Sequence, residues 1–192
     1  MHFILPKKRP DLHSQGLSAL PLFFLAGPIQ GAGDWHVRMS ELLADSAGNS
    51  IVVNPSRYDG RHEHYRHQLD GPEVDIRQTD WERHYLRQAA IDWHAGCIIF
   101  WLAEQVGPRT DGRPYASDTR GELGEWRGHM MHVRNARVVV GAEKDFPGLS
   151  VIERNFQLAL GASFRISDTM EEVAARAAVH AQQSLPLVGR DY

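Results

Sequence analysis

A chain of 192 residues is long enough for a single domain that buries a core without disulfide bonds. Its 21 basic and 24 acidic side chains leave a formal net charge of −3. The composition therefore gives no reason to expect nucleic acid or a membrane as partner, since both select a basic face. No apolar run approaches the roughly 20 residues that span a bilayer, and the run from Leu20 to Ala26 is too short for a signal peptide. We therefore expect a cytoplasmic protein, with its one cysteine, Cys97, packed in an apolar run rather than reactive.

The first part of the chain predicts an irregular segment followed by a strand, a helix and a second strand. Residues 1–19 contain two prolines and show no hydrophobic period. Leu22–Ala26 is a continuous apolar run, typical of a strand buried on both faces of a parallel sheet. Asp34 is a candidate N-cap, and Gly48 a candidate end, for a helix with apolar residues at helical spacing. Ile51–Val53 is the second short strand.

Residues 55–78 form a long polar loop that contains His62, His64 and His67. Three histidines invite a metal site, but their spacing matches no common structural site and no cysteine accompanies them. The alternative is a mobile loop over a ligand pocket, which would also explain its length.

The middle of the chain predicts a helix, a strand and a loop. Thr79 is a candidate cap for a helix that ends between Ala90 and Gly96. Cys97–Ala103 is a third buried strand, and residues 104–117 form a loop with glycine and proline.

The last part of the chain predicts two further strands between two helices. Thr119 with Glu122 fits the Ser/Thr-x-x-Glu capping box that opens a helix. Arg137–Gly141 and Ala162–Ile166 are the fourth and fifth strands, and Ser167–Gln183 is the final helix.

Strands that alternate with helices predict right-handed βαβ units, and therefore an α/β fold with a parallel sheet between two helical layers. We expect one domain over residues 20–183 and a tail over 184–192. Ligands of such folds bind beyond the carboxyl ends of the strands. The glycine-rich segment Gly27–Gly33, the loop 55–78 and the segment Ser117–Gly124 meet there.

Several short segments resemble, in order and spacing, the nucleoside 2-deoxyribosyltransferase superfamily, which includes deoxynucleoside-monophosphate N-glycosidases. The matching segments are Phe24–Ile29, Trp81–Glu82 with Leu86 and Ala89, Ile99–Trp101, Thr119–Trp126 and Val138–Gly141. The resemblance implies a flavodoxin-like (Rossmann-like) three-layer sandwich whose five-stranded parallel sheet has the order 2-1-3-4-5. It also implies an oligomer, a nucleoside or nucleotide substrate and no cofactor.

The resemblance implies that Glu122 attacks C1′ of the sugar and forms a covalent glycosyl–enzyme intermediate, which another base or water then resolves. Such a displacement needs an ionised carboxylate and a proton donor for the departing base. A glutamate in the first turn of a helix is expected to stay ionised, because the helix dipole stabilises its charge. Without the resemblance, a capping-box glutamate would explain Glu122 equally well.

The second carboxyl is open at this stage between Glu82, Asp92 and neither. Glu82 matches an acidic position of the family and would lie early in its helix, near the carboxyl edge of the sheet. Asp92 would lie at the opposite edge if the helix runs unbroken to Ala95.

The resemblance and the position of the loops give candidate substrate-binding residues, namely Gly27, Pro28, Ile29, Gln30, Trp101, Asp118 and Thr119. Asp118 and Thr119 would bond sugar hydroxyls, although both also fit as plain cap residues. Trp101 would stack on a base, although it also fits the core. Gln30 with Arg120 would meet a 5′-phosphate. An N-glycosidase for a larger nucleotide such as NAD, and a nucleotide-binding sensor without turnover, are the alternative functions.

Overall fold

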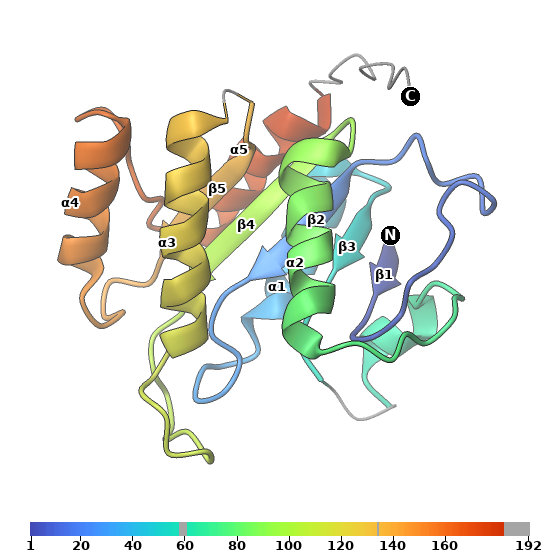
Figure 1. Cartoon of the computed structure of the whole chain (residues 1–192), viewed down its shortest axis with the longest axis horizontal. Helices are drawn as coiled ribbons and strands as arrows, with labels where there is room; N and C mark the ends of the chain where they lie inside the picture. Colours follow the sequence, from blue (N-terminus) through green and yellow to red (C-terminus); the bar gives the residue numbers. More distant parts are fainter. Residues whose placement is uncertain (58–60, 134, 183–192) are drawn as a thin grey trace.

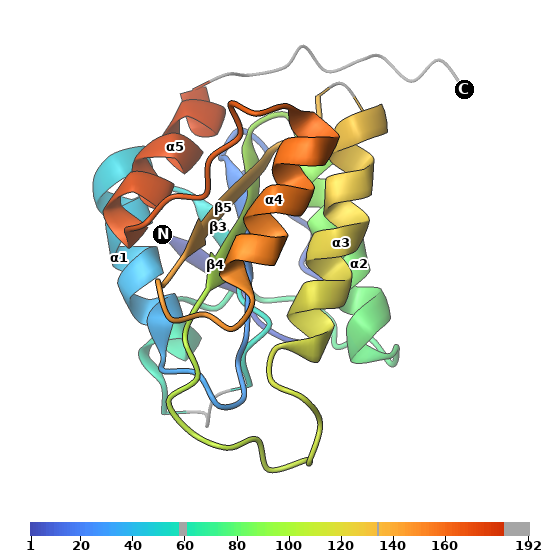
Figure 2. The same ribbon diagram turned by 90° about the vertical axis from the view of Figure 1, so that its left-hand side faces the viewer.

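The computed structural model describes residues 1–57, 61–133 and 135–182. Its centre is a parallel sheet of five strands, and Figures 1 and 2 show helices on both faces of it. The strands are β1 (His2–Ile4), β2 (Leu22–Ala26), β3 (Ile51–Val53), β4 (Gly96–Leu102) and β5 (Val138–Ala142). The predicted α/β three-layer sandwich is therefore confirmed. The predicted tail, 184–192, lies outside the described residues.

The strands are ordered β1-β3-β2-β4-β5, and every neighbouring pair is parallel. Four of these strands follow the predicted order, since β3, β2, β4 and β5 are the predicted second, first, third and fourth strands. The strands are short apolar runs because each is buried on both faces, as a parallel sheet between helical layers requires.

The prediction for the fifth strand is wrong. Ala162–Ile166 forms no strand, and only Ser167 pairs with the sheet, through a single bridge to Gly141. Most of this segment is exposed, so it lacks the apolar burial that a strand here would need. The fifth strand is instead β1, in the N-terminal segment that we expected to be irregular, and it pairs with the edge of β3.

The helices agree with the prediction in part. They are α1 (Trp35–Ala47), a 3-10 turn η1 (Glu63–His67), α2 (Gln78–Arg87), a π-turn η2 (Gln88–Asp92), α3 (Ser117–His132), α4 (Leu149–Leu160) and α5 (Met170–Gln182). α1 ends at Gly48, as predicted, where the backbone has a φ of 72° that glycine adopts without strain. α4 was not predicted, and α2 gives way to η2 rather than running on to Ala95.

Two apolar cores lie on the two faces of the sheet. α2, α3 and α4 cover one face, where Phe24 and Phe100 are buried, and α1 and α5 cover the other, where Trp35 and Trp101 are buried. Among the described residues, no helix combines the length and the apolar character that a membrane crossing requires.

Candidate active site

The loops that leave the carboxyl ends of three strands are hydrogen-bonded to one another. The backbone N–H groups of Val106 and Gly107, after β4, donate to the carbonyl of Gly31, after β2, at 2.8 and 3.1 Å. The N–H of Glu104 donates to the Glu143 carboxylate, after β5, at 2.6 Å. The loops at this edge of the sheet therefore form one connected surface, as expected for a ligand site in an open parallel sheet.

Two helices place Glu82 and Glu122 within electrostatic reach of each other beside this edge. α2 and α3 lie side by side on the same face of the sheet (Figures 1 and 2), and Arg83 of α2 pairs with Glu125 of α3 at 3.3 Å. Both glutamates are partly buried. Burial raises the pKa of Glu122 to about 8, and the charges of Glu82 and Asp118 add to the effect. The predicted pairing of these two carboxyls is consistent with this geometry.

Glu122 does not hold the position that we expected in its helix. α3 begins at Ser117, after Ala116 in a left-handed conformation with a φ of 55°, and no side chain caps it. Glu122 is therefore in the second turn, beyond the orphan N–H groups that stabilise a charge at a helix start. The expected capping box with Thr119 is not formed, and the raised pKa of Glu122 contradicts the expectation that this carboxyl stays ionised in the free protein.

Glu82 lies among groups of mixed charge. Burial raises its pKa, and the charge of Asp118 raises it further. The side-chain amide of Gln78 donates to Glu82 Oε1 at 2.9 Å and opposes that rise, as does the cation of Arg57, which follows β3. The amide oxygen of Gln78 is buried and has no hydrogen-bond partner in the described chain. Gln78 and Arg57 were missed from the sequence, although the i, i+4 spacing of Gln78 and Glu82 is a signal for the first of them.

The alternative second carboxyl, Asp92, lies elsewhere. It ends η2 and accepts a hydrogen bond from Arg87 at 2.9 Å. This end of the α2–η2 segment is close to the amino-terminal edge of the sheet, where Ala95 accepts a hydrogen bond from Leu22. Of the two alternatives, Glu82 is therefore the one whose charge acts on Glu122.

The segment after β2 is a close-packed turn with an exposed tip. A side chain at Gly27 would bring its Cβ within 2.3 Å of the Trp101 carbonyl oxygen, so the turn accepts only glycine without a shift. Pro28 is buried, and its carbonyl accepts a hydrogen bond from the Trp35 indole at 2.9 Å. Ile29 and Gln30, the two other predicted contacts in this segment, are exposed at the tip.

The remaining predicted contacts fall in different places. Trp101 is 2% exposed and lies in the core on the α1–α5 face, away from the two glutamates. Thr119 is buried in α3, and Asp118 is exposed and paired with Arg113. Arg120 donates to the Pro147 carbonyl and lies over the Phe146 ring, at the start of α4. Asp118 is thus the one of these residues that the structure brings to the glutamate pair.

Two of the three histidines of the polar loop, His62 and His64, belong to a closed ring of polar contacts, and His67 is not part of it. His64 contacts Asn54 at 3.1 Å, and its backbone N–H donates to His62 at 3.3 Å. Across from them, His62 contacts Asp34 at 3.4 Å, Asp34 contacts His36 at 3.5 Å, and His36 contacts Ser56 at 3.0 Å. The Ser56 N–H donates back to the Asn54 side chain at 2.9 Å.

This ring fastens the loop after β3 to the start of α1. His36, Asn54, Ser56 and His64 are all buried. Asp34, the expected N-cap of α1, makes no capping hydrogen bond with its side chain. Its carboxylate contacts His36 and His62 of the ring instead. Within the part of the chain that the structure describes, no group of three or more histidine, cysteine, aspartate and glutamate side chains is arranged to hold a metal ion.

Comparison of the chain with models of known protein families finds no match, and comparison with curated proteins finds none either. The resemblance to nucleoside 2-deoxyribosyltransferases therefore remains a prediction from the residues quoted above.

Proposed function

We propose that the protein cleaves or exchanges the N-glycosidic bond of a nucleoside or nucleotide, with Glu122 as the nucleophile and Glu82 as its acid–base partner. The observation that supports this most is the interaction of two partly buried carboxyls from different helices beside the carboxyl edge of the sheet. Paired carboxyls whose environments shift their pKa values are the groups that glycosidic displacement needs.

The proposed chemistry needs one proton on the two carboxyls. Burial, with the charges of Glu82 and Asp118, raises the pKa of Glu122 to about 8, so this carboxyl keeps its proton at neutral pH before a substrate binds. Attack requires that Glu122 is ionised, so the proton must lie on Glu82 when the reaction begins. Gln78, which donates to Glu82, and Arg57 bias the equilibrium the other way, and substrate contacts must overcome that bias.

The bond changes then balance without a cofactor. A Glu122 oxygen forms a bond to C1′ while the C1′–N bond breaks, and the electron pair of that bond goes to the base nitrogen. Glu82 gives its proton to the departing base. Water or a second base then attacks C1′, the C1′–O bond to Glu122 breaks, and the proton of the attacking group passes to Glu82.

The exposed turn after β2 and the side chain of Asp118 are the proposed contacts for the sugar, because they lie at the same edge as the pair. Trp101 is left out of the proposal, since it is buried on the other face. The proposal includes the small-molecule nucleoside partner and the homo-oligomer that the resemblance implies.

The test is release of free base from a panel of nucleosides, 5′-monophosphates and NAD, each with and without a second base as acceptor. We expect release by the wild type and loss of at least about a thousandfold in Glu122→Gln, as for removal of a nucleophile. Glu125→Gln, an exposed neighbour on the same helix, is the matched control and should retain activity.

The outcome also distinguishes the related functions. Capture of the sugar by the acceptor base indicates a transferase, and release without capture a hydrolase. Nicotinamide release would assign the activity to NAD. Turnover that survives in folded Glu122→Gln contradicts the mechanism, and tight binding of one panel member without any release would favour a sensor.

A further inference from the structure

The side-chain amide of Gln78 uses only one of its two ends. Gln78 is the first residue of α2 and lies one helical turn before Glu82. Its Nε2 donates to Glu82 Oε1 at 2.9 Å. Its own Oε1 is buried and, among residues 1–57, 61–133 and 135–182, has no hydrogen-bond partner. Within this part of the chain, the contact with Glu82 is therefore what orients the amide.

The unused end means that a glutamine at this position does not serve stability best. A buried carbonyl that gives up water and gains no partner destabilises the folded chain. Methionine has a similar length and no such acceptor, so it would fill the same space without that cost. The end of the amide that does have a partner is Nε2. The reason for a glutamine here therefore lies in its hydrogen bond to Glu82.

This hydrogen bond makes the two oxygens of the Glu82 carboxyl unequal. Oε1 accepts from Gln78, and it can do so both in the ionised carboxylate and as the carbonyl oxygen of the protonated acid. A proton on Oε1 would instead face the NH2 group of Gln78, which donates hydrogen bonds and accepts none. The proton of Glu82 therefore belongs on Oε2.

Charges from two other segments act on the same carboxyl. Burial raises the pKa of Glu82, and the charge of Asp118 on α3 raises it further, whereas the charge of Arg57, which follows β3, lowers it. Glu122 of α3 interacts with Glu82 through its charge as well. In the described structure, the hydrogen bond that reaches the Glu82 side chain is the one from Gln78. Gln78 is thus the group that can select between the two oxygens.

We propose that Gln78 is a positioning residue for Glu82, which holds Oε1 as an acceptor and reserves Oε2 for the proton that passes to the departing base. The proton of the attacking water or base returns to the same oxygen. The inference rests on the proposed function, because a reaction is what gives this proton a direction. Gln78 acts through Glu82 and does not contact the substrate, so its loss should slow proton transfer rather than weaken substrate binding.

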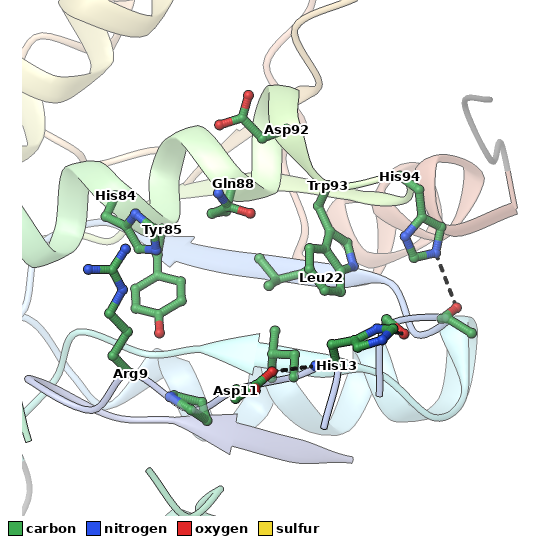
Figure 3. Close-up of a pocket in the computed structure, with 14 residues that line it drawn as sticks. Arg9, Asp11, His13, Leu22, His84, Tyr85, Gln88, Asp92, Trp93 and His94 are labelled. Atoms are coloured by element: carbon green, nitrogen blue, oxygen red, sulfur yellow. Dashed lines mark hydrogen bonds between the residues drawn. The ribbon is translucent and has the colours of Figure 1, made fainter. Parts of the chain in front are cut away.

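A second half-buried glutamine of the α2–η2 segment lies away from this contact and provides a matched control (Figure 3). Gln88 lines a cavity of about 1050 Å³ between the N-terminal segment 9–19 and the residues from His84 to His94. Neither Gln78 nor the glutamate pair lines this cavity. Gln88→Met therefore makes the same chemical change in the same segment without touching the proposed site.

The test compares Gln78→Met with the wild type in the base-release assay. We expect kcat to fall about tenfold, as for the loss of one hydrogen bond to a carboxyl group, and KM to stay within about twofold. Because the lost bond favoured the ionised form of Glu82, the alkaline limit of kcat/KM should move to higher pH. Gln88→Met should change none of these three quantities.

Two further measurements do not depend on turnover. In urea, Gln78→Met should unfold at a concentration no lower than the wild type, because it loses the buried acceptor that has no partner. The NMR signal of the Glu82 carboxyl carbon, assigned with Glu82→Gln, should titrate at higher pH in Gln78→Met than in the wild type.

The outcomes separate this inference from the proposed function. A Glu82 titration that Gln78→Met leaves unchanged would overturn the positioning role, whether or not base is released. So would a fall in the urea midpoint of Gln78→Met with KM and the alkaline limit unchanged, since that result describes a structural residue. Absence of base release by the wild type would overturn the proposed function and this role with it, while a shifted titration would still establish that Gln78 acts on Glu82.

Discussion

Replacement of Glu122 by glutamine should change how the stability of the protein depends on pH. Burial, with the charges of Glu82 and Asp118, raises the pKa of this carboxyl from 4.5 to about 8. A group whose pKa is higher in the folded than in the unfolded chain contributes stability that is complete below the unfolded pKa. That stability is lost as the pH rises through the folded pKa. The wild type should therefore lose stability between pH 4.5 and about 8, because over this range the carboxyl ionises in the unfolded chain while the folded chain holds it protonated.

The size of this effect follows from the shift. One pKa unit corresponds to about 1.4 kcal/mol, so the shift from 4.5 to about 8 amounts to about 5 kcal/mol in full. Between about pH 5 and about pH 8.5, about 4 kcal/mol of it falls within reach of measurement. Glutamine has no proton to lose. As the pH rises from about 5 to about 8.5, the free energy of unfolding of Glu122→Gln should therefore rise by about 4 kcal/mol relative to that of the wild type.

Urea unfolding at the two pH values measures the difference directly. Glu125→Gln is the control, because Glu125 is more exposed and pairs with Arg83. Its stability should follow the wild type at both pH values to within about 1 kcal/mol, the usual worth of an exposed ion pair. Histidines that contact neither residue 122 nor residue 125 act equally in all three proteins and cancel, whereas His129 lies 4.0 Å from Glu125 and loses that partner in the control. If the curves for Glu122→Gln and wild type run parallel from about pH 5 to about pH 8.5, Glu122 is not held in a buried, mutually repelling pair.

Three further predictions concern the turn after β2, the histidine ring and the cysteine. Gly27→Ala should destabilise the protein by about 1–3 kcal/mol in thermal unfolding, because its Cβ would lie 2.3 Å from the Trp101 oxygen; an equal effect of Gly33→Ala, where the space is open, would refute the steric cause. Burial lowers the pKa of His64 to about 4, so the free energy of unfolding should fall by about 2–3 kcal/mol as the pH falls from 6.5 towards 4. His64→Phe should remove this acid dependence in urea titrations. If the dependence persists in the variant, His64 is not its source. Burial raises the pKa of the Cys97 thiol, so a thiol reagent should label it only in urea, and rapid labelling of the native protein would contradict the buried position.

Most of the sheet could be predicted from the sequence because its strands are uninterrupted apolar runs. β2 to β5 each begin and end within about one residue of the predicted strands. β1 was missed because a three-residue strand ahead of a proline has too few residues to show a pattern. α4 does show one, since Leu149, Ile152, Phe156 and Leu160 recur at helical spacing and pack on the core.

The site was less predictable because it depends on a helix boundary and on the burial of two carboxyls. The Ser/Thr-x-x-Glu pattern suggested a helix cap at Thr119, but α3 begins at Ser117. This shift moves Glu122 from the first turn to the second, and burial, which the sequence did not indicate at this position, raises its pKa. Gln78 and Glu82 lie on the same helix, whereas Arg57 belongs to the segment after β3, and the sequence contains no signal that the charge of Arg57 acts on Glu82.

The glutamate pair is difficult to explain by stability alone. A buried carboxyl without a cation costs free energy, and proteins usually neutralise it with an arginine or replace it with an apolar residue. Here Arg83 lies beside the pair, yet its ion pair is with the more exposed Glu125. Gln78 donates to Glu82, and in the described structure no hydrogen bond or ion pair reaches the Glu122 carboxyl. An arrangement that costs stability and raises the pKa values of two neighbouring carboxyls is expected where a reaction needs both an acid and a nucleophile. This is the physical reason to test Glu122 first.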